Sequence, residues 1–155
     1  MAVVFEKLFE KNNWAPVDYN GKQVSISDTI DLPAKKVKLI IRFEQVNGDW
    51  EQGIFLKGKG IFLINSERLT DSIYLWQKSS PDTIECIYES KDCKLKVWNI
   101  WRIDNGSMQY GHNGAALYYQ ETENGKRYYC NDGYPDDDFN DLIFSIEIDA
   151  NSEKK

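Results

Sequence analysis

The sequence predicts an all-β fold, a single-domain antiparallel β-sandwich with a jelly-roll-like character. Segments rich in β-branched and aromatic residues recur about every 8 to 12 positions, which is the spacing of strands in sandwiches. Turn-forming residues separate these segments. The length of 155 residues and the hydrophobic content of 41% suit one folded domain. We expect residues 1–150 to form the sandwich and residues 151–155 to be a frayed, charged tail.

The positions of strands and turns are predicted from the local pattern of residue types. The predicted strands are 37–46, 52–56, 61–65, 72–77, 83–88, 95–101, 115–120 and 142–148. The predicted turns are 47–49, 57–60, 79–82, 104–106 and 123–125. In the last strand we expect one face, with Leu142, Phe144, Ile146 and Ile148, to be buried, and the other face to carry Ser145, Glu147 and Asp149. The opening segment 3–9 fits either a short helix or an edge strand, and we favour the strand.

The net charge of −6 is concentrated near the end of the chain. Residues 1–120 hold 15 acidic and 15 basic residues, whereas residues 121–155 hold 10 acidic and 4 basic ones. This distribution lacks a basic stripe for phosphates, so we expect no nucleic-acid partner. No apolar run is long enough to span a membrane, and residues 1–10 do not resemble a signal peptide. We therefore expect a protein that is cytoplasmic when made, and its later release by a non-classical route stays open. The sequence leaves both a monomer and a homo-oligomer open.

The three cysteines, Cys86, Cys93 and Cys130, lack the spacing of a structural metal site. Cys86 and Cys93 flank a predicted turn, so a disulfide between them across two strands is one alternative. Free buried thiols are the alternative that we favour, because cytoplasmic cysteines are usually reduced.

The densest group of functional side chains lies just before the last predicted strand. Five carboxylates fall within the ten residues from Asp132 to Asp141, with no lysine or arginine among them. Carboxylates this close repel one another unless a cation compensates. Calcium takes about six to eight oxygen ligands, and the alternating side chains of Asp136, Asp138 and Asn140 offer such oxygens. The alternative is an exposed turn in which Asp and Asn side chains cap backbone amides.

The run Asp136-Asp137-Asp138-Phe139-Asn140-Asp141, followed by an apolar strand, resembles the loop of the small bacterial lectins that bind fucose and mannose through two calcium ions. Similar loops occur in other calcium-binding β-sandwich domains. In these lectins the loop aspartates and asparagine hold the ions, and sugar hydroxyls complete the coordination. The resemblance implies that Asp136, Asp138, Asn140 and Asp141 are metal ligands, with Asp132 as a further ligand.

Two tryptophans are candidates for ligand binding, because an indole ring is a flat platform for a sugar. Trp98 shares the exposed side of its predicted strand with Lys96 and Arg102. Trp50, beside a predicted turn, is the second candidate. The alternative for Trp98 is cation–π packing by its basic neighbours.

No catalytic arrangement stands out. The single histidine, His112, has no evident partner, and the sequence contains no nucleophile elbow or phosphate-binding loop. We therefore expect a calcium-binding recognition module that is not an enzyme and that binds a carbohydrate or glycoconjugate in a lectin-like manner. One alternative is a calcium-stapled sandwich that binds a protein or membrane partner, as a toxin or secretion-system accessory would. A hydrolase is the least favoured alternative.

Overall fold

The computed structural model describes residues 4–47, 50–103, 108–110, 114–133 and 138–150. It is a single all-β domain of antiparallel strands, so the predicted fold class is confirmed. The elements are α1 (Phe5–Lys11), β1 (Val17–Tyr19), β2 (Lys22–Val24), β3 (Asp28–Asp31), β4 (Lys36–Val46), β5 (Glu51–Ile64), β6 (Glu67–Trp76), the 3₁₀ turn η1 (Gln77–Ser79), β7 (Thr83–Ser90), β8 (Lys94–Arg102), β9 (Met108–Gln109), β10 (Ala116–Glu121), β11 (Gly125–Asn131) and β12 (Leu142–Asp149). The predicted turn at 104–106, His112 and the tail at 151–155 lie outside the described residues. Within the described ranges, no helix is long and apolar enough to cross a bilayer.

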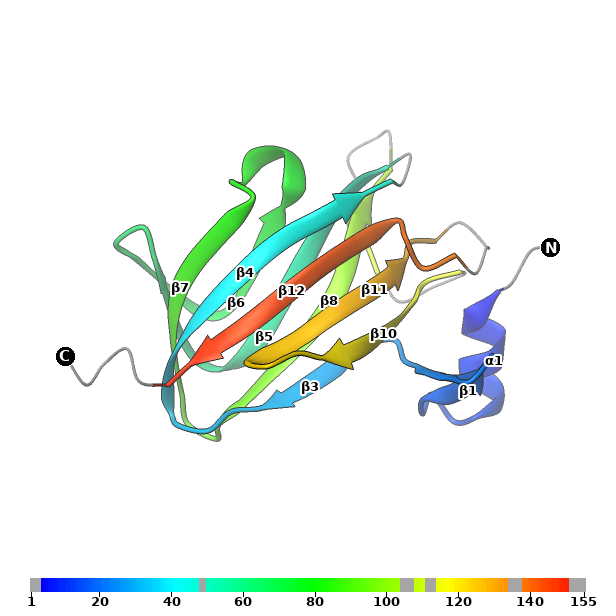
Figure 1. Cartoon of the computed structure of the whole chain (residues 1–155), viewed down its shortest axis with the longest axis horizontal. Helices are drawn as coiled ribbons and strands as arrows, with labels where there is room; N and C mark the ends of the chain where they lie inside the picture. The colour runs from blue at the N-terminus through cyan, green and yellow to red at the C-terminus, as the bar shows by residue number, and fades with distance from the viewer. Residues whose placement is uncertain (1–3, 48–49, 104–107, 111–113, 134–137, 151–155) are drawn as a thin grey trace.

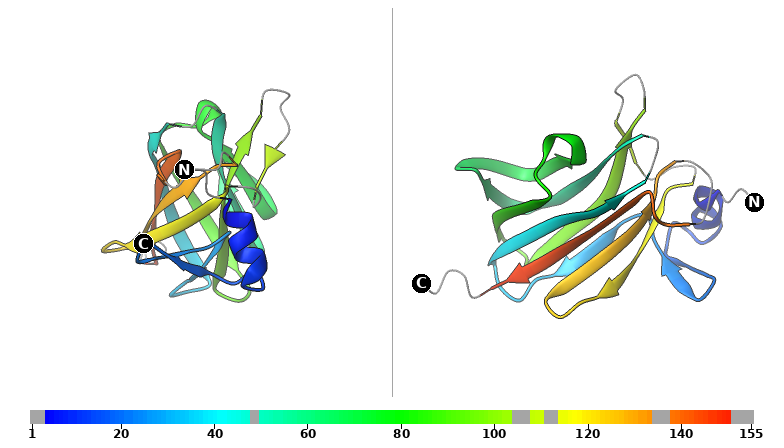
Figure 2. Two further views of the ribbon diagram at one scale, coloured as in Figure 1. Left: turned by 90° about the vertical axis from the view of Figure 1, so that its right-hand side faces the viewer. Right: turned by 45° about the horizontal axis from the view of Figure 1, so that its top comes forward.

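One sheet makes up most of the fold. Its strands follow the order β10-β11-β12-β4-β7-β5-β8-β3, with β6 added to β5 and β9 added to β8. The sheet curls until its two halves face each other as layers (Figures 1 and 2). β10, at one end of this order, contacts the segment between β2 and β3, where Ser25 and Leu117 exchange both backbone hydrogen bonds, each 2.8 Å long. The small β1–β2 pair and α1 lie together at one end of the molecule (Figure 1).

The main core lies between the two layers and is built by strand alternation. In β12 the side chains of Leu142, Phe144 and Ile146 are fully buried, as the sequence predicted, whereas Ile148 is partly buried. Ser145, on the opposite face, is buried as well, because neighbouring strands flank β12 on both sides. Leu56 of β5 and Val97 of β8 join the same buried cluster from the opposite layer. Residues between these positions point outward, so the outer face of β5 and β8 is available for contacts.

Strand β5 belongs to both layers, because it changes neighbours along its length. Residues 51–57 pair with β8, and residues 60–63 pair with β7. On its other side β5 pairs with β6, with a register shift between Lys57 and Ile61. At this shift Asp71 of β6 adopts a φ of 72°, in the left-handed region. This irregularity has the character of a β-bulge, which bends a strand and increases its twist.

The hairpin turn predicted at 57–60 is wrong, because these residues lie inside β5. Gly58 and Gly60 do not reverse the direction of the chain. They allow β7 to approach β5 closely. A Cβ atom on Gly58 would lie 1.7 Å from the hydroxyl oxygen of Tyr88, and one on Gly60 would lie 2.0 Å from the carbonyl oxygen of Glu89. Glycine is thus required where β5 passes from one layer to the other.

The opening segment forms a helix, so the favoured edge strand is wrong. Phe5 and Phe9, one helical turn apart, are both fully buried. They form a second buried cluster with Val24, Ala116 and Phe139. The sequence of this segment fits both the period of a helix and that of a strand. The helix forms because these partners cover side chains that lie four residues apart on one helix face.

All three cysteines are free thiols in the structure. Cys86 and Cys130 are buried, and Cys93 is partly buried. Burial raises the pKa of Cys86 to about 12 and raises the pKa of Cys130 as well. Since the thiolate is the reactive form, these two buried thiols are inert at neutral pH.

Polar side-chain contacts join β3 to β11. The carboxylate of Asp28 accepts hydrogen bonds from Lys126 Nζ at 2.8 Å and from the Tyr128 hydroxyl at 2.7 Å. Burial, together with the adjacent carboxylate, raises the pKa of the Tyr128 phenol. The phenol therefore stays protonated and remains the donor.

We predict that Gly60→Ala lowers the free energy of unfolding by about 1–3 kcal/mol, the usual cost of overpacking. The added methyl group would collide with a backbone carbonyl of β7, which cannot rotate aside. Urea unfolding followed by tryptophan fluorescence measures the change. Lys59→Ala, at the exposed neighbouring position, is the matched control and should leave stability almost unchanged. An unchanged midpoint for Gly60→Ala would contradict the close crossing of β5 and β7.

Candidate functional site

We call residues 132–141 the acidic loop. Its two ends lie side by side where β11 ends and β12 begins, and we call this place its base. β11 and β12 pair with Cys130 opposite Leu142, so the residues that follow β11 and precede β12 are close together. Asp141 Oδ2 accepts a hydrogen bond from the backbone N–H of Asp132 at 3.0 Å. Asp132 is 2% exposed and Asp141 is 8% exposed, so both carboxylates are enclosed by the fold. Two of the predicted metal-site residues therefore lie together beneath the loop.

Side chains from the opposite layer hold this base. Gln52 Nε2 donates to Asp132 Oδ2 at 2.9 Å and to the carbonyl oxygen of Trp50 at 3.1 Å. Because both partners are acceptors, they define which end of the amide carries the nitrogen. Gln52 Oε1 is buried and has no hydrogen-bond partner among the described residues. Nearby, Asn99 Nδ2 donates to the carbonyl oxygen of Asn131 at 2.8 Å, so polar contacts join the two layers here.

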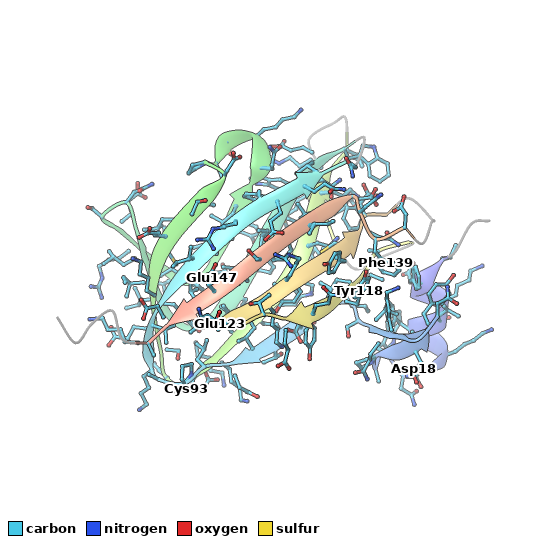
Figure 3. The ribbon with its side chains drawn as sticks, in the orientation of Figure 1. Asp18, Cys93, Tyr118, Glu123, Phe139 and Glu147 are labelled. Atoms are coloured by element: carbon cyan, nitrogen blue, oxygen red, sulfur yellow. The ribbon has the colours of Figure 1, made fainter. Side chains whose placement is uncertain are left out.

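Phe139 fastens the acidic loop to the N-terminal helix. Its backbone N–H donates to Asn131 Oδ1 at 2.7 Å, and its φ of 53° lies in the left-handed region, which is uncommon for an aromatic residue. The ring is buried, with its centroid 5.4 Å from that of Phe5 and 5.1 Å from that of Tyr118 (Figure 3). Phe139, α1 and β10 thus form one packed unit.

Asp138 and Asn140 flank Phe139. Asp138 is exposed, and its Oδ1 accepts a hydrogen bond of 3.4 Å from the backbone N–H of Asn140, as in an Asx turn. Asp136 lies outside the described residues. Among the residues that are described, no three His, Cys, Asp or Glu side chains converge on one point. The oxygens present, from carboxylates and a carboxamide, are nevertheless of the type that calcium takes.

Trp50 lies close to the base of the acidic loop, on the buried Trp101. The two rings stack at 15° with their centroids 6.4 Å apart. Trp101 also covers Gly133, where a Cβ atom would lie 2.7 Å from the indole ring. Trp50 is half-buried, so the predicted platform is a partly covered member of a tryptophan pair.

Trp98 belongs to a row of aromatic side chains on the outer face of the sheet. Phe55 of β5 lies directly opposite Tyr74 of β6 on one side and Trp98 of β8 on the other. The ring centroids of Phe55 and Tyr74 are 4.6 Å apart, and those of Phe55 and Trp98 are 5.0 Å apart. Tyr110 meets Trp98 edge-on at 6.3 Å. We call these four residues the aromatic row.

Three rings of the aromatic row, those of Phe55, Tyr74 and Trp98, stack on one another, whereas the ring of Tyr110 meets Trp98 edge-on. Between adjacent strands the planes of the stacked rings differ by 10° and 26°, and their centroids are about one strand spacing apart. Exposed ring surface is greatest at Tyr74 and Tyr110, which are 48% and 49% exposed. Lys96 Nζ lies 4.8 Å from the centroid of the Trp98 ring, so the cation–π contact considered from the sequence is present.

A second apolar strip lies beside the aromatic row on the same outer face. Trp76 of β6 lies over Gly53, close to Ile100 of β8. The guanidinium of Arg102 packs on the Trp76 ring at 3.8 Å from its centroid. A cationic group therefore borders the aromatic surface on this side as well.

Sequence reasoning identified Trp98 but missed its partners in the aromatic row. Phe55 and Tyr74 become its neighbours only through the register of β5 with β6 and β8. A local signal did exist, since Phe55 has the opposite parity to the buried Ile54 and Tyr74 the opposite parity to the buried Ile73. An aromatic residue on the outward parity of a strand is the pattern that would have found them.

The fold and the site define an all-β sandwich domain with two buried carboxylates beneath one loop and an aromatic row on its outer face. No family model, curated protein or solved structure matches this chain. The function of this chain is therefore inferred from its own residues.

We predict that Phe139→Ala destabilises the protein by about 3–5 kcal/mol, as is usual for removing a buried phenylalanine. The loss should appear first in α1, whose Phe5 packs on the missing ring. Chemical unfolding gives the free energy, and hydrogen exchange gives the protection of the α1 amides. With all unfolding measured in chelator, the exposed neighbour provides the control, because Asp138→Ala removes no buried contact. Undiminished protection of α1 in Phe139→Ala would show that the helix is held by other contacts.

Proposed function

We propose that this protein is a carbohydrate-recognition module that binds sugar along the aromatic row and calcium in the acidic loop. The observation that supports the proposal is the aromatic row. Soluble proteins seldom expose contiguous aromatic side chains, and such patches mark contact surfaces. A sugar suits this one, because a pyranose presents apolar C–H groups to exposed ring carbon and hydroxyl groups to the polar side chains around it.

Polar side chains next to the aromatic row supply partners for those hydroxyl groups. Lys57 of β5 lies opposite Ser72 of β6 and Lys96 of β8, in the neighbouring row of the same face. These side chains offer ammonium and hydroxyl donors beside the rings. A surface that combines exposed ring carbon with several donors favours a ligand that is itself both apolar and hydroxylated.

We propose that calcium serves as a structural ion of the loop and does not contact the sugar directly. The candidate ligands are Asp132, Asp136, Asp138, Asn140 and Asp141. Asp132 and Asp141 support the structural role, since both are buried and each accepts a hydrogen bond from the protein. A sugar hydroxyl would have to enter the fold to reach them. The buried Oε1 of Gln52, whose Nε2 is bonded to Asp132, is a further neutral oxygen that can coordinate the ion.

Tyr74→Ala and Tyr110→Ala are each expected to weaken glycan binding about 3- to 10-fold, because an aromatic contact contributes about 0.5–1.5 kcal/mol. A glycan array identifies the sugar, and titration calorimetry gives its affinity. Tyr119→Ala is the control, since Tyr119 is similarly exposed (40%) but lies on β10. Equal affinities for the three variants, or no bound glycan, would contradict the proposal and favour a protein or membrane partner.

Calcium is expected to raise the unfolding temperature of chelator-stripped protein, since a ligand at about 100 times its dissociation constant stabilises by about 2.7 kcal/mol. Asp138→Ala should lose this shift yet melt like the wild type in chelator, because Asp138 is exposed and its one described bond is 3.4 Å long. Asp18→Ala, at an exposed aspartate of β1 (Figure 3), should keep the full shift. An equal shift with magnesium, or in Asp138→Ala, would argue against a calcium site here. Loss of sugar binding by folded Asp138→Ala would contradict the purely structural role.

A further inference from the structure

A lysine-lined groove opens beside the aromatic row. It has a volume of about 970 Å³ and lies where β5 passes from β8 to β7, with Trp98 on its wall. Its lysines are Lys35, Lys57, Lys59, Lys91, Lys94 and Lys96. Its carboxylates are Asp71, Glu89 and Asp92. Six ammonium groups against three carboxylates leave an excess of positive charge, although the whole chain carries a net charge of −6.

Within the described part of the chain, only one of these six lysines makes an ion pair. Lys94 pairs with Asp31 at 2.7 Å, next to the turn of Cys93 that Figure 3 labels. Among the ion pairs of the described residues, none involves another lysine of the groove. All six lysines are exposed, so their charge is presented to solvent at one place.

Two of the lysines oppose each other directly. Lys57 of β5 and Lys96 of β8 are cross-strand partners on the outer face, and like charges in this arrangement destabilise a sheet. The third strand of this row contributes Ser72, which carries no compensating charge. An arrangement that costs stability in the free protein is relieved when an anion lies between the two ammonium groups.

We infer that the groove binds an acidic polysaccharide, a chain of uronic acid or sulfated sugars that continues from the aromatic row onto the lysines. This inference rests on the proposed function, because the groove and the row share Trp98. The acidic groups would lie between Lys57 and Lys96, while the sugar rings would contact the aromatic row. The carboxylates of the groove suit the same ligand, because they accept hydrogen bonds from sugar hydroxyls.

A single-stranded nucleic acid fits these observations less well. Proteins that bind single strands stack successive bases on free aromatic faces. In the aromatic row the faces of Phe55 are covered by Tyr74 and Trp98, so bases have little room to stack between them. The three carboxylates of the groove can accept hydrogen bonds from the hydroxyl groups of each sugar, whereas a phosphodiester linkage offers them no donor.

The test compares oligogalacturonate with its methyl ester, which has the same backbone but no charge, and dextran sulfate with dextran. Titration calorimetry is done in chelator at about 0.05 M and about 0.5 M salt, a range over which screening of exposed charges changes strongly. We expect the charged member of at least one pair to bind more tightly, and its affinity to fall with salt. Lys57→Gln/Lys59→Gln should weaken that binding at least about fivefold. The matched control Lys7→Gln/Lys78→Gln, which removes the same charge elsewhere, should not.

The variants also report on stability. Because Lys57 opposes Lys96, Lys57→Gln should melt at the same temperature as the wild type or higher. Equal binding of charged and neutral members would overturn the inference while leaving the proposed function intact. Failure of all four glycans to bind would overturn the inference, and an additional failure on the glycan array would overturn the proposed function. Tighter binding of oligothymidylate than of either charged glycan would also overturn the inference, in favour of a nucleic acid.

Discussion

The passage of β5 between two layers is the constraint on which the rest of the structure depends. One half of β5 pairs with β8 and the other half with β7, so a single strand turns a continuous sheet into a sandwich. The crossing requires glycine at two positions, since a side chain at either would occupy the space of the neighbouring strand. The same strand places Gln52 inward beneath the acidic loop and Phe55 outward in the aromatic row. Both parts of the candidate site therefore share one scaffold strand.

The acidic loop and the aromatic surface have different physical characters. The described ends of the loop are held by buried polar contacts and by Phe139, which packs on α1. The aromatic row and the lysine groove lie on regular strands, whose register sets the spacing of the side chains. Sites on strands are held more rigidly than sites on loops. This difference is why we assign direct ligand contact to the sheet face and a structural ion to the loop.

The sequence predicted the fold class because strand alternation is a local signal, as the buried Leu142, Phe144 and Ile146 illustrate. It failed at residues 57–60, since Gly-Lys-Gly is equally typical of a turn and of a crowded strand crossing, and only the neighbouring chain decides. It failed at α1 for a similar reason, because the partners of Phe5 come from distant parts of the chain.

At the candidate site, sequence reasoning located the acidic loop and Trp98. The aromatic row and the groove could not be predicted, because they arise from cross-strand register between β5, β6 and β8. Register depends on long-range pairing and on bulges such as that near Asp71, which leave little trace in local composition.

The position of β12 has a consequence for the order in which the chain can fold. β12 lies between β11 and β4, in the middle of its layer, and the ion pair of Arg42 with Glu147 joins residues 105 positions apart. The layer cannot close until residues 142–149 have emerged from the ribosome. Before that, β4 and β11 each present an unpaired edge, and such edges recruit strands from other molecules. Pairing over so long a separation is also slow. Insertion of β12 is thus the step at which productive folding competes with aggregation.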